Sequence, residues 1–115
     1  MYNLNGKVAL VTGTSPNIMG GIAEGMAEEG ANVVCVDINP AYAEKCAQAV
    51  KNLGREAIAI ACDVTDEAQV IAAVDLAKET FGGVDILVNG ATVFNWKGVL
   101  DMPVDEWRSQ TDVML

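Results

Sequence analysis

The sequence predicts an α/β protein built on a doubly wound parallel sheet. Three observations lead to this fold class: short apolar runs alternate with segments of helical periodicity, glycines end the helical segments, and polar residues follow the apolar runs. Strands that alternate with helices favour parallel pairing through right-handed crossovers. At 115 residues, the chain has room for one domain with one core.

The strands are the short apolar runs. Residues 8–12 (VALVT) form a continuous apolar run, which is typical of a strand buried on both faces. Residues 31–38 and 56–64 repeat the pattern, and so do residues 84–90. The last run contains DILV, which is typical of a buried and paired strand, although in a chain of 115 residues this strand would lie at the edge of the sheet.

Helices fill the segments between the strands. Glycine, a common C-terminal stop, follows the first three of them. Pro40 and Pro103 suit a first helical turn, and Asp66 can cap a helix N-terminus. The expected helices cover residues 22–30, 40–54, 66–82 and 103–115.

Composition and charge exclude several functions. The net charge is −9, and the chain lacks the clustered Lys and Arg that neutralise nucleic-acid phosphates. No apolar run approaches the roughly 20 residues of a membrane span, and the N-terminal MYNLNGK lacks an apolar signal core. We therefore expect a cytoplasmic protein with no nucleic-acid or membrane partner, in which any bound phosphate is held by backbone amides.

Cysteine and histidine usage excludes several kinds of site. The chain has three cysteines, an odd number, and they show no CxxC spacing: Cys35, Cys46 and Cys62. We interpret them as small buried apolar residues rather than as metal ligands or disulfide partners. The chain has no histidine, which argues against a zinc site or a Ser-His-Asp triad, so no metal is expected.

Polar residues follow each strand. Gly13 opens the turn TGTSPNIMGG, which suits a pyrophosphate because glycine lets the backbone come close and helix N–H groups face the anion. Asp37 lies 24 residues later, where a carboxylate can accept ribose hydroxyls and repel a 2′-phosphate. CDVTD (62–66) and LVNGAT (87–92) follow the next two strands. Each feature also has a structural interpretation, as a loop glycine, a capping aspartate or a turn.

Together these residues resemble the short-chain dehydrogenase/reductase family. Thr12-Gly13, Asp37, Asp63-Val64 and Asn89 occur in the family's order and at its spacing over the whole chain. The resemblance implies a Rossmann fold whose first four strands have the order 3-2-1-4. It further implies an oxidoreductase that uses NAD or NADP to transfer a hydride to or from an alcohol or carbonyl substrate. Asp37 favours NAD, and relatives are commonly homodimers or tetramers.

The resemblance also implies which residues bind the cofactor. The full set is Gly13, Asn17, Ile18, Asp37, Ile38, Asp63, Val64, Asn89 and Ala91. The first three of these residues would hold the pyrophosphate, and Asp37 would hold the adenosine ribose. Asp63 and Val64 would flank the adenine, and the last two residues would line the cofactor channel.

Three stretches depart from the family pattern, one of which is NGAT at residues 89–92, where the family has NNAG. The pattern TGxxxGxG has glycines where this chain has Asn17 and Met19. Asn tolerates positive φ, so Asn17 can replace the second glycine; Gly20 and Gly21 are expected to supply the close helix–strand approach of the third. Near the end of the chain, the family's VNL reads VML, so Met114 cannot act in the proton relay. Weakened cofactor binding is an open alternative.

The family's catalytic Ser and Tyr-x-x-x-Lys pair do not occur in these 115 residues. Tyr42 and Lys45 are three residues apart, not four, and receive no catalytic role. We expect residues 1–115 to be the dinucleotide-binding domain in the N-terminal part of a longer reductase. The alternative is a dinucleotide-binding or interaction module without catalysis. A P-loop domain is disfavoured, because no GK[ST] follows the glycines.

Overall fold

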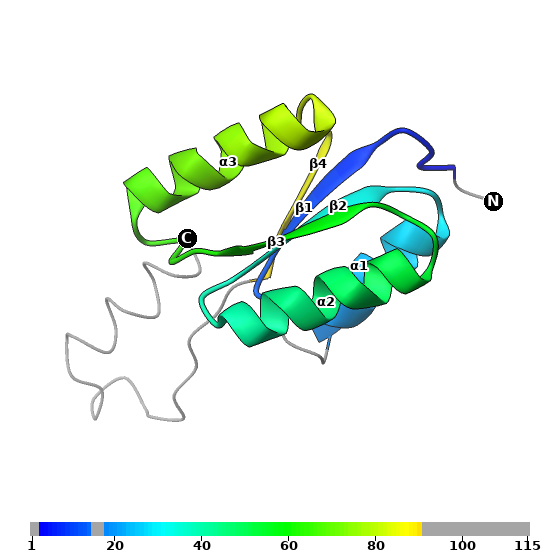
Figure 1. Cartoon of the computed structure of the whole chain (residues 1–115), viewed down its shortest axis with the longest axis horizontal. Helices are drawn as coiled ribbons and strands as arrows, with labels where there is room; N and C mark the ends of the chain where they lie inside the picture. The colour runs from blue at the N-terminus through cyan, green and yellow to red at the C-terminus, as the bar shows by residue number, and fades with distance from the viewer. Residues whose placement is uncertain (1–2, 15–17, 91–115) are drawn as a thin grey trace, which may run out of the picture.

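The computed structural model describes residues 3–14 and 18–90, and strands alternate with helices throughout them (Figure 1). This alternation confirms the predicted α/β fold class. The helix expected at 103–115 lies outside the described residues. The strands are β1 (Val8–Thr12), β2 (Asn32–Asp37), β3 (Ala57–Ala61) and β4 (Ile86–Asn89). The helices are α1 (Ile18–Glu28), α2 (Pro40–Asn52) and α3 (Glu67–Phe81).

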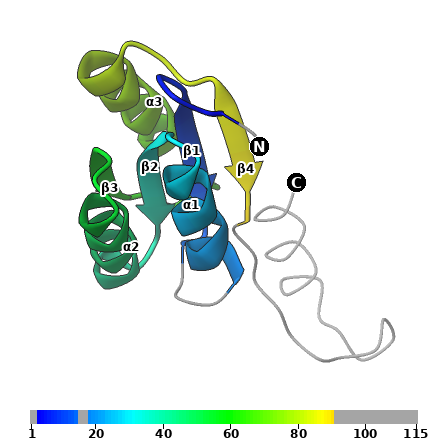
Figure 2. The same cartoon turned by 90° about the vertical axis from the view of Figure 1, so that its right-hand side faces the viewer.

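The four strands form one parallel sheet in the order β3-β2-β1-β4, as predicted (Figure 2). β1 lies inside the sheet and pairs with β2 on one side and β4 on the other. The chain moves outward from β1 to β3 and then returns to the other side of β1. This reversal is a topological switch point, beyond which open α/β sheets bind their ligands.

Helices cover both faces of the sheet: α1 and α2 lie on one face and α3 on the other (Figure 1). Side chains of β1 and β2 alternate between the two faces, as strand geometry requires. Ala9, Val11, Val33 and Cys35 pack with α1 and α2, whereas Val8, Leu10, Val34 and Val36 pack on the α3 side. Because both faces are covered, every residue of β1 is buried, which explains its continuous apolar run.

Helix α3 begins and ends at residues that the sequence predicts. The Asp66 side chain accepts hydrogen bonds from the backbone N–H groups of Ala68 (3.0 Å) and Gln69 (3.3 Å), so its capping role is confirmed. Gly82 ends the helix in the left-handed region at φ +87°, and its N–H donates to the Lys78 carbonyl. None of the three described helices has the length and apolar character needed to span a membrane.

β4 lies at the edge of the sheet among the described strands, as expected for a chain of 115 residues. Its DILV run is typical of a buried and paired strand, whereas β4 pairs only with β1 among the described strands. Its Leu87 side chain is 60% exposed. The difference arises because no described element covers the outer side of β4. An exposed apolar edge strand is a site for association unless another element covers it.

Replacing Gly82 by alanine should lower the free energy of unfolding by about 1–2 kcal/mol, because an L side chain is strained at positive φ. Gly25→Ala is a matched control, since Gly25 lies within α1 at ordinary helical φ. A Cβ would meet no atom within 4 Å at either position. Gly25→Ala should therefore raise the free energy of unfolding by about 0.5–1 kcal/mol.

Urea unfolding of the two purified variants and the parent protein measures both effects. If Gly82→Ala is as stable as the parent, then position 82 does not have the left-handed backbone conformation that ends α3 here, and this description of the helix end is wrong.

Candidate functional site

The carboxyl edge of the sheet brings together the polar residues singled out in the sequence. In a parallel sheet all strands end on the same edge. Thr12 at the end of β1 is the register partner of Asn89 at the end of β4, and Asp37 ends the adjacent strand β2. Gly13 follows β1 directly, and Asp63 follows β3. Residues up to 77 positions apart in the sequence thus share one edge of the sheet.

Gly13 turns the chain away from β1. Its φ is +71°, a conformation that strains residues with a Cβ. The Gly13 N–H donates to the Val36 carbonyl of β2 at 2.8 Å. The hydroxyl of Thr14, which is almost completely buried, donates to the same carbonyl at 3.4 Å. The first residues of the turn are therefore held against β2. The positive φ at position 13 explains why this residue is glycine.

Thr12 and Thr14, which were not among the predicted site residues, organise this edge. The Thr12 hydroxyl donates to the Val88 carbonyl at 3.5 Å and accepts from the Gly90 N–H at 3.1 Å. It therefore bridges the ends of β1 and β4 across the switch point, while Thr14 bonds in the opposite direction to β2. A sequence signal existed, because hydroxyls that flank a glycine at the end of a buried strand must find partners.

Asp37 is a buried carboxylate, only 8% exposed, at the end of β2. Its Oδ1 accepts the backbone N–H of Asn39 at 2.8 Å. A carboxylate can accept about four hydrogen bonds, so acceptor capacity remains after this turn is formed. The next residue, Ile38, leaves 69% of its apolar side chain exposed. An acceptor beside an exposed apolar side chain fits a ligand that carries hydroxyl groups and a flat ring.

Asp63 shapes the turn before α3. Its Oδ1 accepts the N–H of Thr65 at 3.0 Å and the Thr65 hydroxyl at 2.7 Å. The Asp63 N–H donates to Oε1 of Gln69 at 2.8 Å. The hydrogen bonds from Thr65 lower the pKa of Asp63 from its ordinary value of 3.8. Asp63 therefore has a structural role in the turn that leads to α3, and Val64 is partly buried in the same turn.

Comparison with known proteins identifies the family. The profile of the short chain dehydrogenase family matches residues 7–115. The chain belongs to the short-chain dehydrogenase/reductase family. Galactitol 2-dehydrogenase from Agrobacterium fabrum is 41% identical over 97% of this chain. D-threitol dehydrogenase from Mycolicibacterium smegmatis is 38% identical over 99% of it.

A solved structure extends this comparison. The crystal structure of NAD+-bound xylitol dehydrogenase matches 96% of this chain with a TM-score of 0.90 and 38% identity. The matches cover 43% of the galactitol enzyme, 44% of the threitol enzyme and 43% of the xylitol enzyme. The chain therefore spans less than half the length of the relatives it matches.

The family's glycine-rich turn is only partly described. Asn17 in this turn lies outside the described residues, and Ile18 begins α1. Ala91, the predicted site residue after β4, also lies outside them. The expectation that Gly20 and Gly21 supply the close approach is not met at Gly21, which is exposed and has no atom of another described residue within 4 Å of an added Cβ. Successive helical residues point about 100° apart, so only Gly20 of this pair faces inward.

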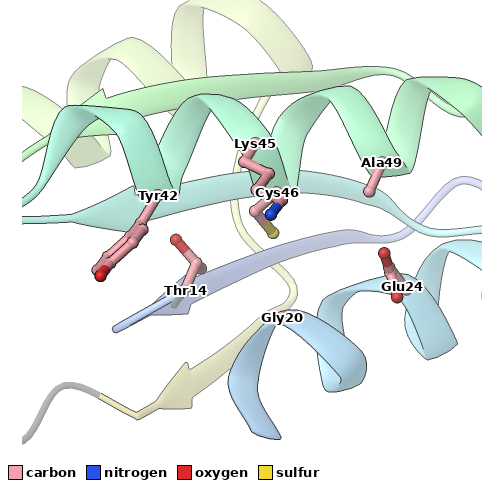
Figure 3. Close-up of a pocket in the computed structure, with 7 residues that line it drawn as sticks. All are labelled: Thr14, Gly20, Glu24, Tyr42, Lys45, Cys46 and Ala49. Carbon is pink, nitrogen blue, oxygen red and sulfur yellow. The ribbon is translucent and has the colours of Figure 1, made fainter. Parts of the chain in front are cut away.

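A cavity of about 260 Å³ opens between α1 and α2 beside Thr14 (Figure 3). Tyr42 and Lys45 line it from α2, a helix that packs on β2 and β3 and lies away from β4. The residues that line the cavity are Thr14, Gly20, Glu24, Tyr42, Lys45, Cys46 and Ala49.

Within residues 3–14 and 18–90, no group of three or more acidic or cysteine side chains could hold a metal ion.

Replacing Thr65 by valine should raise the pKa of Asp63 towards 3.8, because the hydroxyl that stabilises its carboxylate is lost. In the parent protein, ionised Asp63 stabilises the fold at pH values above 3.8, and this contribution is lost as the pH falls through the lowered pKa. NMR titration of the Asp63 side-chain carboxyl carbon measures the shift. Thr80→Val, which removes an exposed hydroxyl from α3, should leave the pKa of Asp63 unchanged. An equal pKa in the parent and Thr65→Val would contradict the assignment.

Proposed function

We propose that residues 1–115 form the cofactor-binding half of an NAD-dependent oxidoreductase, which transfers a hydride between the nicotinamide and an alcohol or carbonyl substrate. Membership of the short-chain dehydrogenase/reductase family supports the reaction class. The observation that carries the cofactor assignment is the buried carboxylate of Asp37, which ends β2 next to the Gly13 turn. Both lie at the edge where open α/β sheets bind ligands.

The pyrophosphate site consists of backbone groups. N–H groups in the first turn of α1 have no helical acceptor, and the helix dipole places partial positive charge there. That turn contains no acidic residue, so no carboxylate opposes an anion. The whole chain has a net charge of −9, so local dipoles must provide the attraction. Gly13, Asn17 and Ile18 are the residues proposed to bind the two phosphates.

The adenosine site surrounds Asp37. Its remaining acceptor capacity is proposed to receive the two ribose hydroxyls, and its negative charge to repel the 2′-phosphate of NADP. The NAD+-bound relative supports a nicotinamide dinucleotide, and Asp37 supports NAD as the preferred form. Ile38 offers an exposed apolar contact beside the ribose. Asp63 and Val64 are proposed to flank the adenine, and Asn89 and Ala91 to line the channel that leads to the nicotinamide.

The names of the relatives suggest which alcohols to test first. Galactitol, D-threitol and xylitol are all acyclic sugar alcohols. A panel of such polyols, tested with both NAD and NADP, is therefore the first substrate screen for the protein. The resemblance to the family further supports a cytoplasmic homodimer or homotetramer.

Replacing Asp37 by alanine should weaken NAD binding about tenfold to hundredfold, because a charge-assisted hydrogen bond contributes about 1.5–3 kcal/mol. NADP binding should change little or improve, since a repulsive charge is removed. Isothermal titration calorimetry with each dinucleotide measures the effect. Asp75→Ala removes the same charge from the exposed side of α3 and should alter neither affinity.

Asp37→Asn tests whether an effect of Asp37→Ala is only structural. Asparagine keeps an oxygen that can accept the Asn39 N–H but loses the negative charge. It should therefore reduce the preference for NAD over NADP without loss of stability. If the Asp37 variants lose both dinucleotides equally, or neither, the ribose assignment is incorrect.

A dinucleotide-binding or interaction module without catalysis is the second candidate. Asn17 and Met19 in place of the family's glycines favour it, and so does the absence of a close contact at Gly21. Restoring glycine at positions 17 and 19 separates the two functions. A working enzyme should bind NAD with nearly unchanged affinity, whereas a site that has lost its function should gain affinity in the same calorimetric titration.

A further inference from the structure

Cys35 and Cys46 form a close pair of thiols behind the Asp37 turn. Cys35 lies on β2 and Cys46 on α2, and their sulfur atoms are 3.2 Å apart. The burial predicted for the cysteines is confirmed, because all three are buried and free. Cys62 belongs to the cluster on the other face of the sheet, so the pair stands apart from the third thiol.

A small oxidant has a route to the pair. Cys46 lines the cavity between α1 and α2, together with the polar side chains of Thr14, Glu24 and Lys45 (Figure 3). Its volume of about 260 Å³ lies below the roughly 300–1,000 Å³ of sites for drug-sized ligands but greatly exceeds that of a peroxide. Cys35 is 0% exposed and is not among the residues that line this cavity, so Cys46 is the sulfur that an oxidant in the cavity meets first.

The hydrogen bond between the thiols gives them different reactivity. Cys35 donates to the sulfur of Cys46, and this bond lowers the pKa of Cys46 against the opposing effects of burial and of the carboxylates of Glu24 and Asp37. The same bond and burial raise the pKa of Cys35. Because the thiolate is the nucleophile, Cys46 is the thiol suited to attack and Cys35 the thiol that keeps its proton.

We propose that Cys35 and Cys46 are a redox modification site, at which a peroxide converts the dithiol into a disulfide that links β2 to α2. The Cys46 thiolate attacks one peroxide oxygen, the O–O bond breaks, and the leaving hydroxide takes up a proton to become water. The Cys35 sulfur then attacks the sulfenic sulfur of Cys46, and the S–O bond breaks. The leaving hydroxide takes the Cys35 proton as a second water. Two thiols are oxidised and one peroxide is reduced.

The two sulfur atoms already lie close together. A disulfide holds its sulfurs about 2.05 Å apart, so the pair must close by about 1 Å from its present 3.2 Å. The bond would close a loop that contains Asp37 and the α2 cap Asn39. Intracellular disulfides of this kind are usually transient, and a thiol reductant reverses them.

Peptide mapping tests the proposal directly, because trypsin places each cysteine in a different peptide: residues 8–45, 46–51 and 56–78. The native protein is treated with a slight excess of hydrogen peroxide, unfolded, alkylated and digested without reduction. Peptides 8–45 and 46–51 should appear linked, within a monomeric chain, and dithiothreitol should separate them. Peptide 56–78 should appear alkylated. Recovery of all three as alkylated peptides, or a link that includes Cys62, would overturn the proposal.

Single variants assign the order of attack. In Cys35→Ala, a 1,3-dione probe should trap the sulfenic acid on Cys46, whereas in Cys46→Ala the probe should not label Cys35. Cys62→Ala is the matched control and should still form the 35–46 link. Labelling of Cys35 in the absence of Cys46 would reverse the assigned roles. If Cys35→Ala or Cys46→Ala fails to fold, peptide mapping of the wild type and of Cys62→Ala still shows whether the 35–46 link forms.

Discussion

The burial of β1 between two helical layers and two partner strands is the constraint on which the rest of the structure depends. β1 pairs with β2 and β4, and none of its five residues faces solvent. Burying a valine side chain such as Val11 stabilises the fold by about 1.5–3 kcal/mol. Because the neighbouring strands run parallel to β1, the position at which it ends fixes the position of the site.

The end of β1 is tied to both neighbours. Gly13 and Thr14 bond to the Val36 carbonyl of β2, and Thr12 bonds to the Val88 carbonyl and the Gly90 N–H at the end of β4. These contacts fix the start of the turn before any ligand arrives. A preorganised turn loses little conformational entropy on binding, which is an advantage for a site built from backbone groups.

The junction between β2 and α2 combines three properties within a few residues. Asp37 supplies a buried carboxylate, Asn39 caps α2, and the Cys35–Cys46 pair lies directly behind them. The chain as a whole is acidic, so the proposed binding of a dinucleotide depends on helix and backbone dipoles for attraction and on one carboxylate for selectivity. The residue that is proposed to recognise the ribose therefore lies between the two cysteines in the sequence.

The sequence by itself determined the features that arise from local chemistry: the buried run of β1, the glycine at the end of α3 and the Asp66 cap. Only the tertiary structure showed that Thr12 bridges to Gly90, 78 residues away, and that the sulfurs of Cys35 and Cys46 meet. It also showed that Gly21 faces open space and that Leu87 is exposed. Periodicity and capping reflect neighbours along the chain, whereas these contacts depend on strand register and on how each helix is rotated against the sheet.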